Sequence, residues 1–102
     1  KASGNGTISG ASFTFNADSK PSGRISYTAG ALSMKGTVTS YTPGGASADF
    51  GGPCSMSSGN CTFTAHATDG APDSFSIKIY DTNGVLIHQA GGPLTGGDIT
   101  VK

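Results

Sequence analysis

Apolar and polar side chains alternate along most of this chain, most clearly between Cys61 and Asp81. Over residues 61–68, Cys61, Phe63 and two alanines fall on one face, with threonines and His66 on the other. After a turn, Phe75 begins a second alternating run over residues 74–80. A period of two places one set of side chains against a core and the other in water, as in an antiparallel sheet.

Shorter windows of the same kind fill the rest of the chain, separated by Gly, Pro or Asp. They predict strands over residues 6–9, 11–17, 24–29, 32–41, 46–50, 85–87 and 98–102, with breaks at Pro43-Gly44-Gly45 and Gly51-Gly52-Pro53. The segment Asp81-Thr82-Asn83-Gly84 predicts a tight turn, because Asn-Gly adopts positive φ readily. About eight or nine short strands indicate one all-β domain over residues 1–102, either a β-sandwich or a small barrel.

Composition and charge exclude several classes of protein. Hydrophobic residues make up 34% and charged residues 12% of the chain, and six basic residues balance six acidic ones. A nucleic-acid-binding protein needs a basic stripe, and the cations here are scattered singly. We expect no membrane span, since no apolar run approaches the roughly 20 residues that cross a bilayer. We interpret the chain as a mature form from which an export signal has been removed.

Two cysteines indicate the compartment. Cys54 and Cys61 enclose Ser-Met-Ser-Ser-Gly-Asn, which reads as a turn. A disulfide there would stabilise the fold by roughly 2.5 kcal/mol on the loop-entropy estimate. The alternatives are two reduced thiols or a zinc site, but two cysteines without a nearby histidine do not complete four ligands. We expect an oxidised protein that is secreted or displayed at the cell surface.

Asp69 and Asp73 share one predicted loop and form a candidate calcium site. Calcium prefers six to eight oxygen ligands, and two carboxylates with backbone carbonyls supply part of such a set. The alternative is ordinary turn chemistry, in which each carboxylate accepts hydrogen bonds from nearby amides. The spacing does not match an EF-hand loop, and the sequence indicates no other cofactor.

Tyr41 and Tyr80 are candidate sugar-stacking residues, because they lie out of phase with the apolar side chains of their strands. His66 and His88 read as surface residues. No nucleophile elbow accompanies them, and isolated Asp residues in turns do not form a glycosidase pair. We therefore expect a protein that is not an enzyme.

The chain ends could add to a sheet edge. The candidates for strand exchange are Thr7, Ile8, Ile99 and Val101, each in a short terminal segment of mixed polarity. An exposed edge offers unpaired amides and carbonyls that a neighbour's terminal strand can satisfy. Head-to-tail addition of this kind builds a filament. The alternative is that each terminal strand pairs within its own domain.

Several short motifs occur in a recognisable order: Gly6-Thr7-Ile8, Phe13-Thr14-Phe15, Cys61-Thr62-Phe63-Thr64, Thr68-Asp69-Gly70-Ala71-Pro72 and Leu94-Thr95-Gly96-Gly97-Asp98-Ile99. This order resembles the small β domain called post-COAP, found in exported bacterial proteins. The resemblance implies an accessory module at the cell surface or outside the cell, without a catalytic signature.

These observations lead to two functional hypotheses. The first is a non-enzymatic extracellular structural subunit that self-associates into a homo-oligomer or homopolymer, including a pilus-like filament built by terminal-strand exchange. The second is an adhesion module that binds carbohydrate or another surface, with cell-surface glycans as partners.

Overall fold

The computed structural model describes residues 1–101, and its regular elements are all strands. All paired strands are antiparallel, in the order β10-β1-β2-β3-β4-β6-β7-β8-β9, with β5 pairing separately with β6. The all-β fold predicted from the alternation is confirmed. The strands are β1 (Ala2–Ile8), β2 (Ala11–Asp18), β3 (Ser22–Ala29), β4 (Leu32–Thr37), β5 (Ser40–Gly44), β6 (Ser47–Met56), β7 (Gly59–Thr68), β8 (Ser74–Tyr80), β9 (Leu86–Pro93) and β10 (Gly96–Val101).

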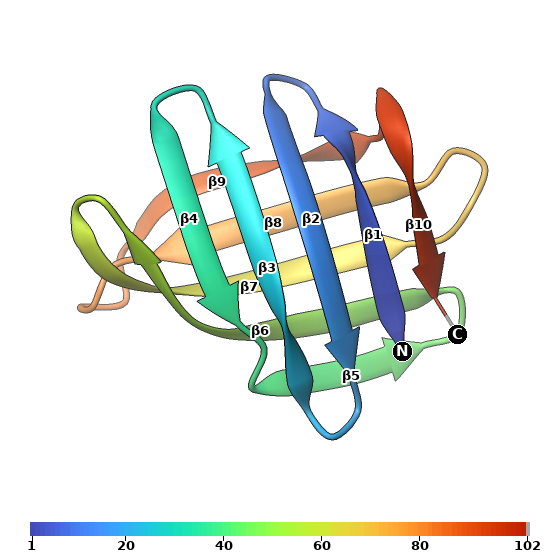
Figure 1. The fold of residues 1–102 in the computed structure, drawn as a ribbon, viewed down its shortest axis with the longest axis horizontal. Helices are drawn as coiled ribbons and strands as arrows, with labels where there is room; N and C mark the ends of the chain where they lie inside the picture. The colour runs from blue at the N-terminus through green and yellow to red at the C-terminus, as the bar shows by residue number, and fades with distance from the viewer. Residues whose placement is uncertain (102) are drawn as a thin grey trace.

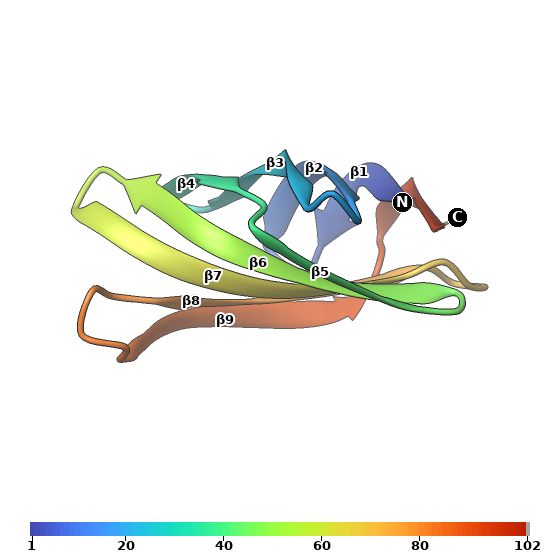
Figure 2. The same ribbon diagram turned by 90° about the horizontal axis from the view of Figure 1, so that it is seen from below.

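The sheet curls into two layers whose strands cross (Figure 1). Strands β10, β1, β2, β3 and β4 form the first layer, and β5 to β9 lie behind them as the second layer. Figure 2 shows the two layers from the side, with β6 rising from the second layer towards β4. Strands β10 and β9, at the two ends of the strand order, do not pair with each other, so the sheet forms a half-barrel.

Strand β6 carries the sheet from one layer to the other. Its residues 54–56 pair with β4, and its residues 47–51 pair with β5. Two glycines lie where the pairing changes. A Cβ on Gly51 would lie 2.5 Å from a β7 carbonyl oxygen, and a Cβ on Gly52 would overlap a β4 carbonyl oxygen. Side chains at these two positions would therefore push the neighbouring backbones apart.

Phenylalanine side chains from both layers fill the space between them. Phe13 and Phe75 stack with ring centroids 3.9 Å apart, and Phe15 lies 4.9 Å from Phe50. Such aromatic pairs contribute about 0.5–1.5 kcal/mol beyond the area they bury. The other large side chains that are almost fully buried are Tyr27, Met34, Val38, Phe63, Ile77, Ile79 and Ile99.

The predicted disulfide is present. Cys54 on β6 and Cys61 on β7 are direct cross-strand neighbours, with an S–S distance of 2.07 Å and a Cα–Cα distance of 4.8 Å. The bridge closes the β6–β7 hairpin next to its turn, as the sequence predicted.

Several strand boundaries differ from those predicted. The predicted strand over residues 32–41 is divided into β4 and β5, because the chain leaves the first layer at Val38 and Thr39, whose amides donate to Gly23 and Gly51. The predicted break at residues 51–53 is instead the middle of β6. Strand β1 begins at Ala2 rather than at residue 6. The last strand is described up to residue 101, and Lys102 of the predicted strand lies outside the described residues.

The interpretation of His88 as a surface residue is wrong. Ile87 is 46% exposed, whereas His88 faces the interior and its Nε2 lies 2.7 Å from the Tyr27 hydroxyl. The cause is an irregularity in the β8–β9 pairing between Ile79 and Tyr80. A shift of one residue moves every following side chain to the opposite face.

Replacing Phe15 with alanine tests the importance of the aromatic contact between the layers. We expect Phe15→Ala to lower the free energy of unfolding by about 3–5 kcal/mol, because the change removes a buried ring and leaves a cavity. The neighbouring exposed Thr14 provides the control, and Thr14→Ala should change stability by less than about 0.5 kcal/mol. Urea unfolding followed by circular dichroism measures both variants. Equal effects would contradict this assignment of the core.

Candidate functional site

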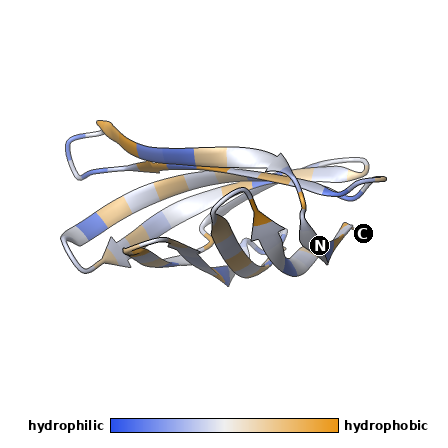
Figure 3. Ribbon diagram, turned by 90° about the horizontal axis from the view of Figure 1, so that it is seen from above, coloured by the Kyte–Doolittle hydropathy of each residue, from blue (hydrophilic) through white to orange (hydrophobic). Residues whose placement is uncertain are grey.

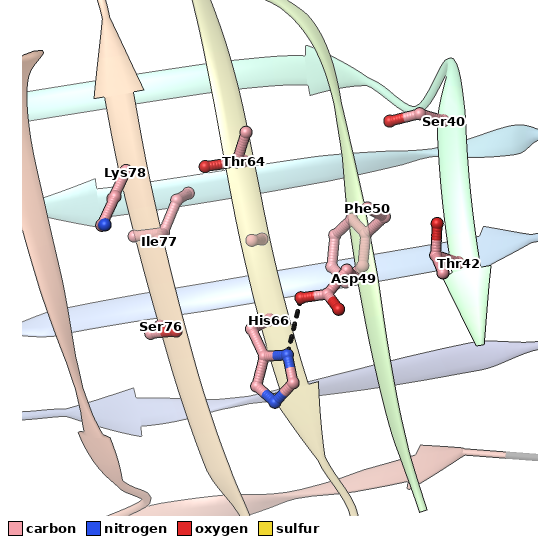
Figure 4. A pocket seen from close by; sticks show the side chains of 10 residues that line it. Ser40, Thr42, Asp49, Phe50, Thr64, His66, Ser76, Ile77 and Lys78 are labelled. Atoms are coloured by element: carbon pink, nitrogen blue, oxygen red, sulfur yellow. Dashed lines mark hydrogen bonds and ion pairs between the residues drawn. The ribbon is translucent and has the colours of Figure 1, made fainter. Parts of the chain in front are cut away.

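A shallow groove of about 320 Å³ lies on the outer face of the second layer (Figure 4). Cross-strand pairing places Thr42 of β5, Asp49 of β6, His66 of β7 and Ser76 of β8 in one row. Within this row, Nδ1 of His66 lies 2.7 Å from Oδ1 of Asp49. The alternation of the strands produces this row, because all four residues occupy the outward positions.

His66 links a carboxylate to a hydroxyl. Its Nε2 lies 3.3 Å from Oγ1 of Thr68, so an imidazole that donates from Nδ1 to Asp49 can accept from Thr68. The side chains of His66 and Asp49 remain 45% and 66% exposed, and an ion pair in that setting stabilises little. Strand β7 is paired on both sides, so its amides are used within the sheet. The groove thus offers an imidazole, a carboxylate and hydroxyls as hydrogen-bonding groups.

The aspartates predicted as a calcium site lie against β10. Asp73 accepts hydrogen bonds from the Gly70 amide at 2.8 Å and from the Ile99 amide at 2.8 Å. Asp69 accepts one from the Val101 amide at 3.3 Å. The two β10 amides lie on the side of the strand that faces away from β1, so the carboxylates fill part of the free edge of β10.

Asp98 of β10 completes this acidic corner. Hydrogen bonds from the Ile99 and Gly70 amides lower the pKa of Asp73 below its usual value of 3.8. Hydrogen bonding to Asp73, followed by the negative charge of Asp73, raises the pKa of Asp98 above 3.8. Within residues 1–101, no group of three or more His, Cys, Asp or Glu side chains is arranged to hold a metal ion. Calcium binding at Asp69 and Asp73 stays a prediction.

Asp81 performs the turn chemistry typical of aspartate, in the connection between β8 and β9. Asp81 accepts hydrogen bonds from the Asn83 and Val85 amides, at 2.9 and 3.0 Å. Its own amide donates to the Val85 carbonyl, and Gly84 has a φ of 81°, so the tight turn predicted here is present.

The two candidate sugar-stacking tyrosines do not form one platform. Tyr41 faces inward on β5 and packs against the core, and its hydroxyl is buried without a hydrogen-bond partner. The expectation that Tyr41 points outward is therefore wrong. The phase was misread because the bend at residues 38–39 separates β4 from β5. Tyr80 is half-buried on the outer face of β8, opposite Thr62. Burial, together with the charge of Asp18, raises the pKa of Tyr41.

The candidate strand-exchange residues lie in the two terminal strands, which pair with each other. Ile8 and Ile99 are 2% and 1% exposed. Thr7 binds the segment before β10, since its carbonyl accepts from the Thr95 amide at 2.8 Å. Val101 of β10 is the register partner of Ala2 in β1. In this single chain, β1 lies between β10 and β2, and β10 has one strand neighbour.

Two surface features were not predicted from the sequence. One is the free edge of β9, where Val85, Leu86 and Ile87 are 57%, 42% and 46% exposed. Three consecutive apolar residues break the alternation, and this was the available signal. The other is a groove on the first layer that contains Arg24 and Lys35. Recognising it requires knowing which strands are neighbours.

No protein-family model, curated protein or solved structure matches this chain. The resemblance to the post-COAP domain therefore stays a prediction. Among residues 1–101, no helix is long and apolar enough to cross a membrane.

The acidic corner predicts two opposite effects of pH on stability. The lowered pKa of Asp73 means that its charge stabilises the fold above pH 3.8, and this contribution is lost as the pH falls through the folded-state pKa. The raised pKa of Asp98 means that its charge destabilises the fold at neutral pH, and the cost disappears as the pH falls. Asp73→Asn should thus lower the melting temperature at pH 7, and Asp98→Asn should raise it.

Thermal unfolding between pH 7 and pH 2.5 measures both variants. Each difference from the unchanged protein should shrink as the pH falls towards and below the usual carboxyl value of 3.8. Shifts that are constant over this range, or that have the same sign for both variants, would contradict the assigned roles. In the same assay, a calcium-induced rise in melting temperature that Asp69→Asn abolishes would support the predicted calcium site.

Proposed function

We propose that this protein is a non-enzymatic extracellular structural subunit that self-associates through the free edge of β9. The observation that carries the proposal is the difference between this edge and the other two edges of the sheet. An edge strand presents unpaired amides and carbonyls to any partner strand, and monomeric β proteins usually protect such edges.

The edges at β10 and β5 are both protected. On β10, Asp73 and Asp69 accept hydrogen bonds from the outward amides of Ile99 and Val101. An incoming strand would have to displace these carboxylates. Strand β5 has only five residues and includes Pro43, which has no amide donor. Short strands and proline are two common means of preventing edge pairing.

The edge at β9 is less protected, because its one proline, Pro93, is the last residue of the strand and no carboxylate within residues 1–101 accepts a hydrogen bond from its amides. Strand β9 has eight residues, and none of them is aspartate, glutamate, lysine or arginine. Its first two residues, Leu86 and Ile87, are exposed, as is Val85 just before them. Figure 3 shows this hydrophobic start of β9 at the outer rim of the second layer. A charged residue on the edge would oppose pairing, and this strand has none.

A second copy of the chain is the partner that fits this edge. Two β9 strands can pair antiparallel about a twofold axis, and an uncharged strand meets no like-charge repulsion when it pairs with itself. The pairing would join the second layers of two subunits into one sheet and bury the apolar residues at the start of each β9. The Cys54–Cys61 disulfide supports an oxidising compartment outside the cytoplasm.

Terminal-strand exchange is the filament-forming version of this function. Strand β10 has one strand neighbour, and only Leu94 and Thr95 separate it from β9. A short connection of this kind can open and let β10 pair with β1 of another subunit. This version differs from edge pairing in that β10 must leave its own domain.

Self-association should appear in analytical ultracentrifugation as a dimer whose fraction rises with protein concentration. Ile87→Lys places a charge on the β9 edge and should weaken the dimer at least about tenfold. Thr64→Lys provides the control, because Thr64 is also exposed but lies on β7, which is paired on both sides. A monomer at all concentrations, or equal dimerisation of both variants, would contradict the proposal.

A locked variant separates edge pairing from strand exchange. Asn5 and Asp98 are cross-strand neighbours on β1 and β10, so Asn5→Cys with Asp98→Cys should form a disulfide that holds β10 in its own subunit. Edge pairing predicts that the oxidised variant still associates. Fibres in electron micrographs of the unchanged protein that disappear in the oxidised variant and return on reduction would favour strand exchange instead.

A further inference from the structure

A second groove, of about 400 Å³, crosses the outer face of the first layer. It lies over β2, β3 and β4 and reaches the end of β6, where these strands adjoin one another (Figure 1). Its volume falls within the range of small-molecule sites. The outward side chains that line it include Asn16, Arg24, Ser26, Lys35, Thr37 and Ser55.

Two exposed cations lie close together in this groove. Arg24 is the register partner of Thr37, and Lys35 is the register partner of Ser26, so the cations are diagonal neighbours on β3 and β4. Diagonal neighbours in a sheet are separated by about 7–8 Å. Among residues 1–101, neither cation has a carboxylate within ion-pair distance. The nearby Asp18 carboxylate instead accepts from the Lys20 amide and the Ser22 hydroxyl in the β2–β3 turn.

The groove is rich in hydrogen-bond donors. Arginine and lysine donate without accepting. Asn16 uses its amide oxygen to accept from the backbone of Arg24 at 3.1 Å, which leaves its NH₂ group available to donate. The hydroxyls of Ser26, Thr37 and Ser55 can donate or accept. A ligand with clustered negative acceptors would therefore match the site, and a carboxylate can bind arginine with two parallel hydrogen bonds.

We propose that this groove binds an acidic oligosaccharide, with a sugar carboxylate on Arg24 and Lys35. The surrounding hydroxyls and the Asn16 amide provide partners for the neutral hydroxyls of the sugar. Nucleic acid fits less well, because the groove has no exposed aromatic side chain for base stacking and only two cations. A lipid surface fits less well too, because the outward side chains of the groove are polar.

The groove and the β9 edge can be occupied together. The groove lies on the outer face of the first layer, and the β9 edge belongs to the second layer. A β9-paired dimer would thus carry two grooves, and a long acidic polymer that bridged them would bind more tightly than a single site allows. The groove proposal does not depend on dimerisation, because all of its residues come from one chain.

The first test is an NMR titration of the intact chain with trigalacturonic acid as the acidic probe. We expect saturable amide shifts over β2, β3 and β4, and at least about a tenfold loss of affinity in Arg24→Gln and in Lys35→Gln. Lys78→Gln provides the matched control, because Lys78 is an exposed cation on the outer face of β8 and should leave binding unchanged. All three positions are exposed, so the variants should fold normally, and their thermal unfolding checks this.

Other probes distinguish the chemistry that is recognised. Galactotriose lacks the carboxylates. It should bind at least about tenfold more weakly than trigalacturonic acid if the groove recognises the carboxylate charge. A carrageenan tetrasaccharide, which carries sulfates and no carboxylates, and a short single-stranded oligonucleotide test sulfate and phosphate in place of the carboxylate. Stronger binding of the oligonucleotide would overturn the proposal in favour of a nucleic-acid partner. Equal weakening by Lys78→Gln, no saturable shift, or shifts centred on the second layer would overturn the site itself.

Discussion

The whole fold depends on β6 belonging to both layers. Its end pairs with β4 and its beginning pairs with β5. This one strand therefore bends the continuous sheet into two layers whose strands cross. That turn requires close backbone contact at Gly51 and Gly52, where a side chain would separate β6 from its neighbours. The aromatic contacts between the layers follow from it, because the bend brings Phe50 over Phe15. The disulfide to β7 closes the end of β6 that lies beside β4.

The half-barrel has an outer strand at each end of its strand order, β10 and β9. The groups that lie along these two strands determine the chemistry of each edge. A closed barrel satisfies every backbone amide within the sheet, whereas an open sheet leaves two outer strands partly unpaired. Here the end at β10 is filled by the carboxylates of Asp69 and Asp73, while β9 has exposed apolar side chains and no charge. The acidic corner therefore has a structural role in the single chain. The contrast between the two ends is the basis for the proposal that the protein self-associates through β9.

The sequence predicted the fold class because alternation and turn chemistry act locally. The runs at residues 61–68 and 74–80, the Asp81–Gly84 turn and the Cys54–Cys61 bridge all appear as expected. Strand boundaries failed where long-range pairing overrides local composition. Glycines at residues 51 and 52 looked like a break, but in the structure they let β6 approach its neighbours closely. Tyr41 and His88 were assigned to the wrong face because a bend and a pairing irregularity shift the phase.

The sequence by itself determined the all-β fold class, the oxidised cysteine pair and the predominantly polar outer faces, since each depends on residues close together in the chain. Only the tertiary structure decided which outer residues share a groove. Arg24 and Lys35, and likewise Asp49 and His66, become neighbours through strand pairing and register. It also decided which edge is open, because the amides of β10 are capped by aspartates from the distant β7–β8 loop. The packing of the whole core determines which distant segments pair, and a local sequence pattern does not specify that pairing.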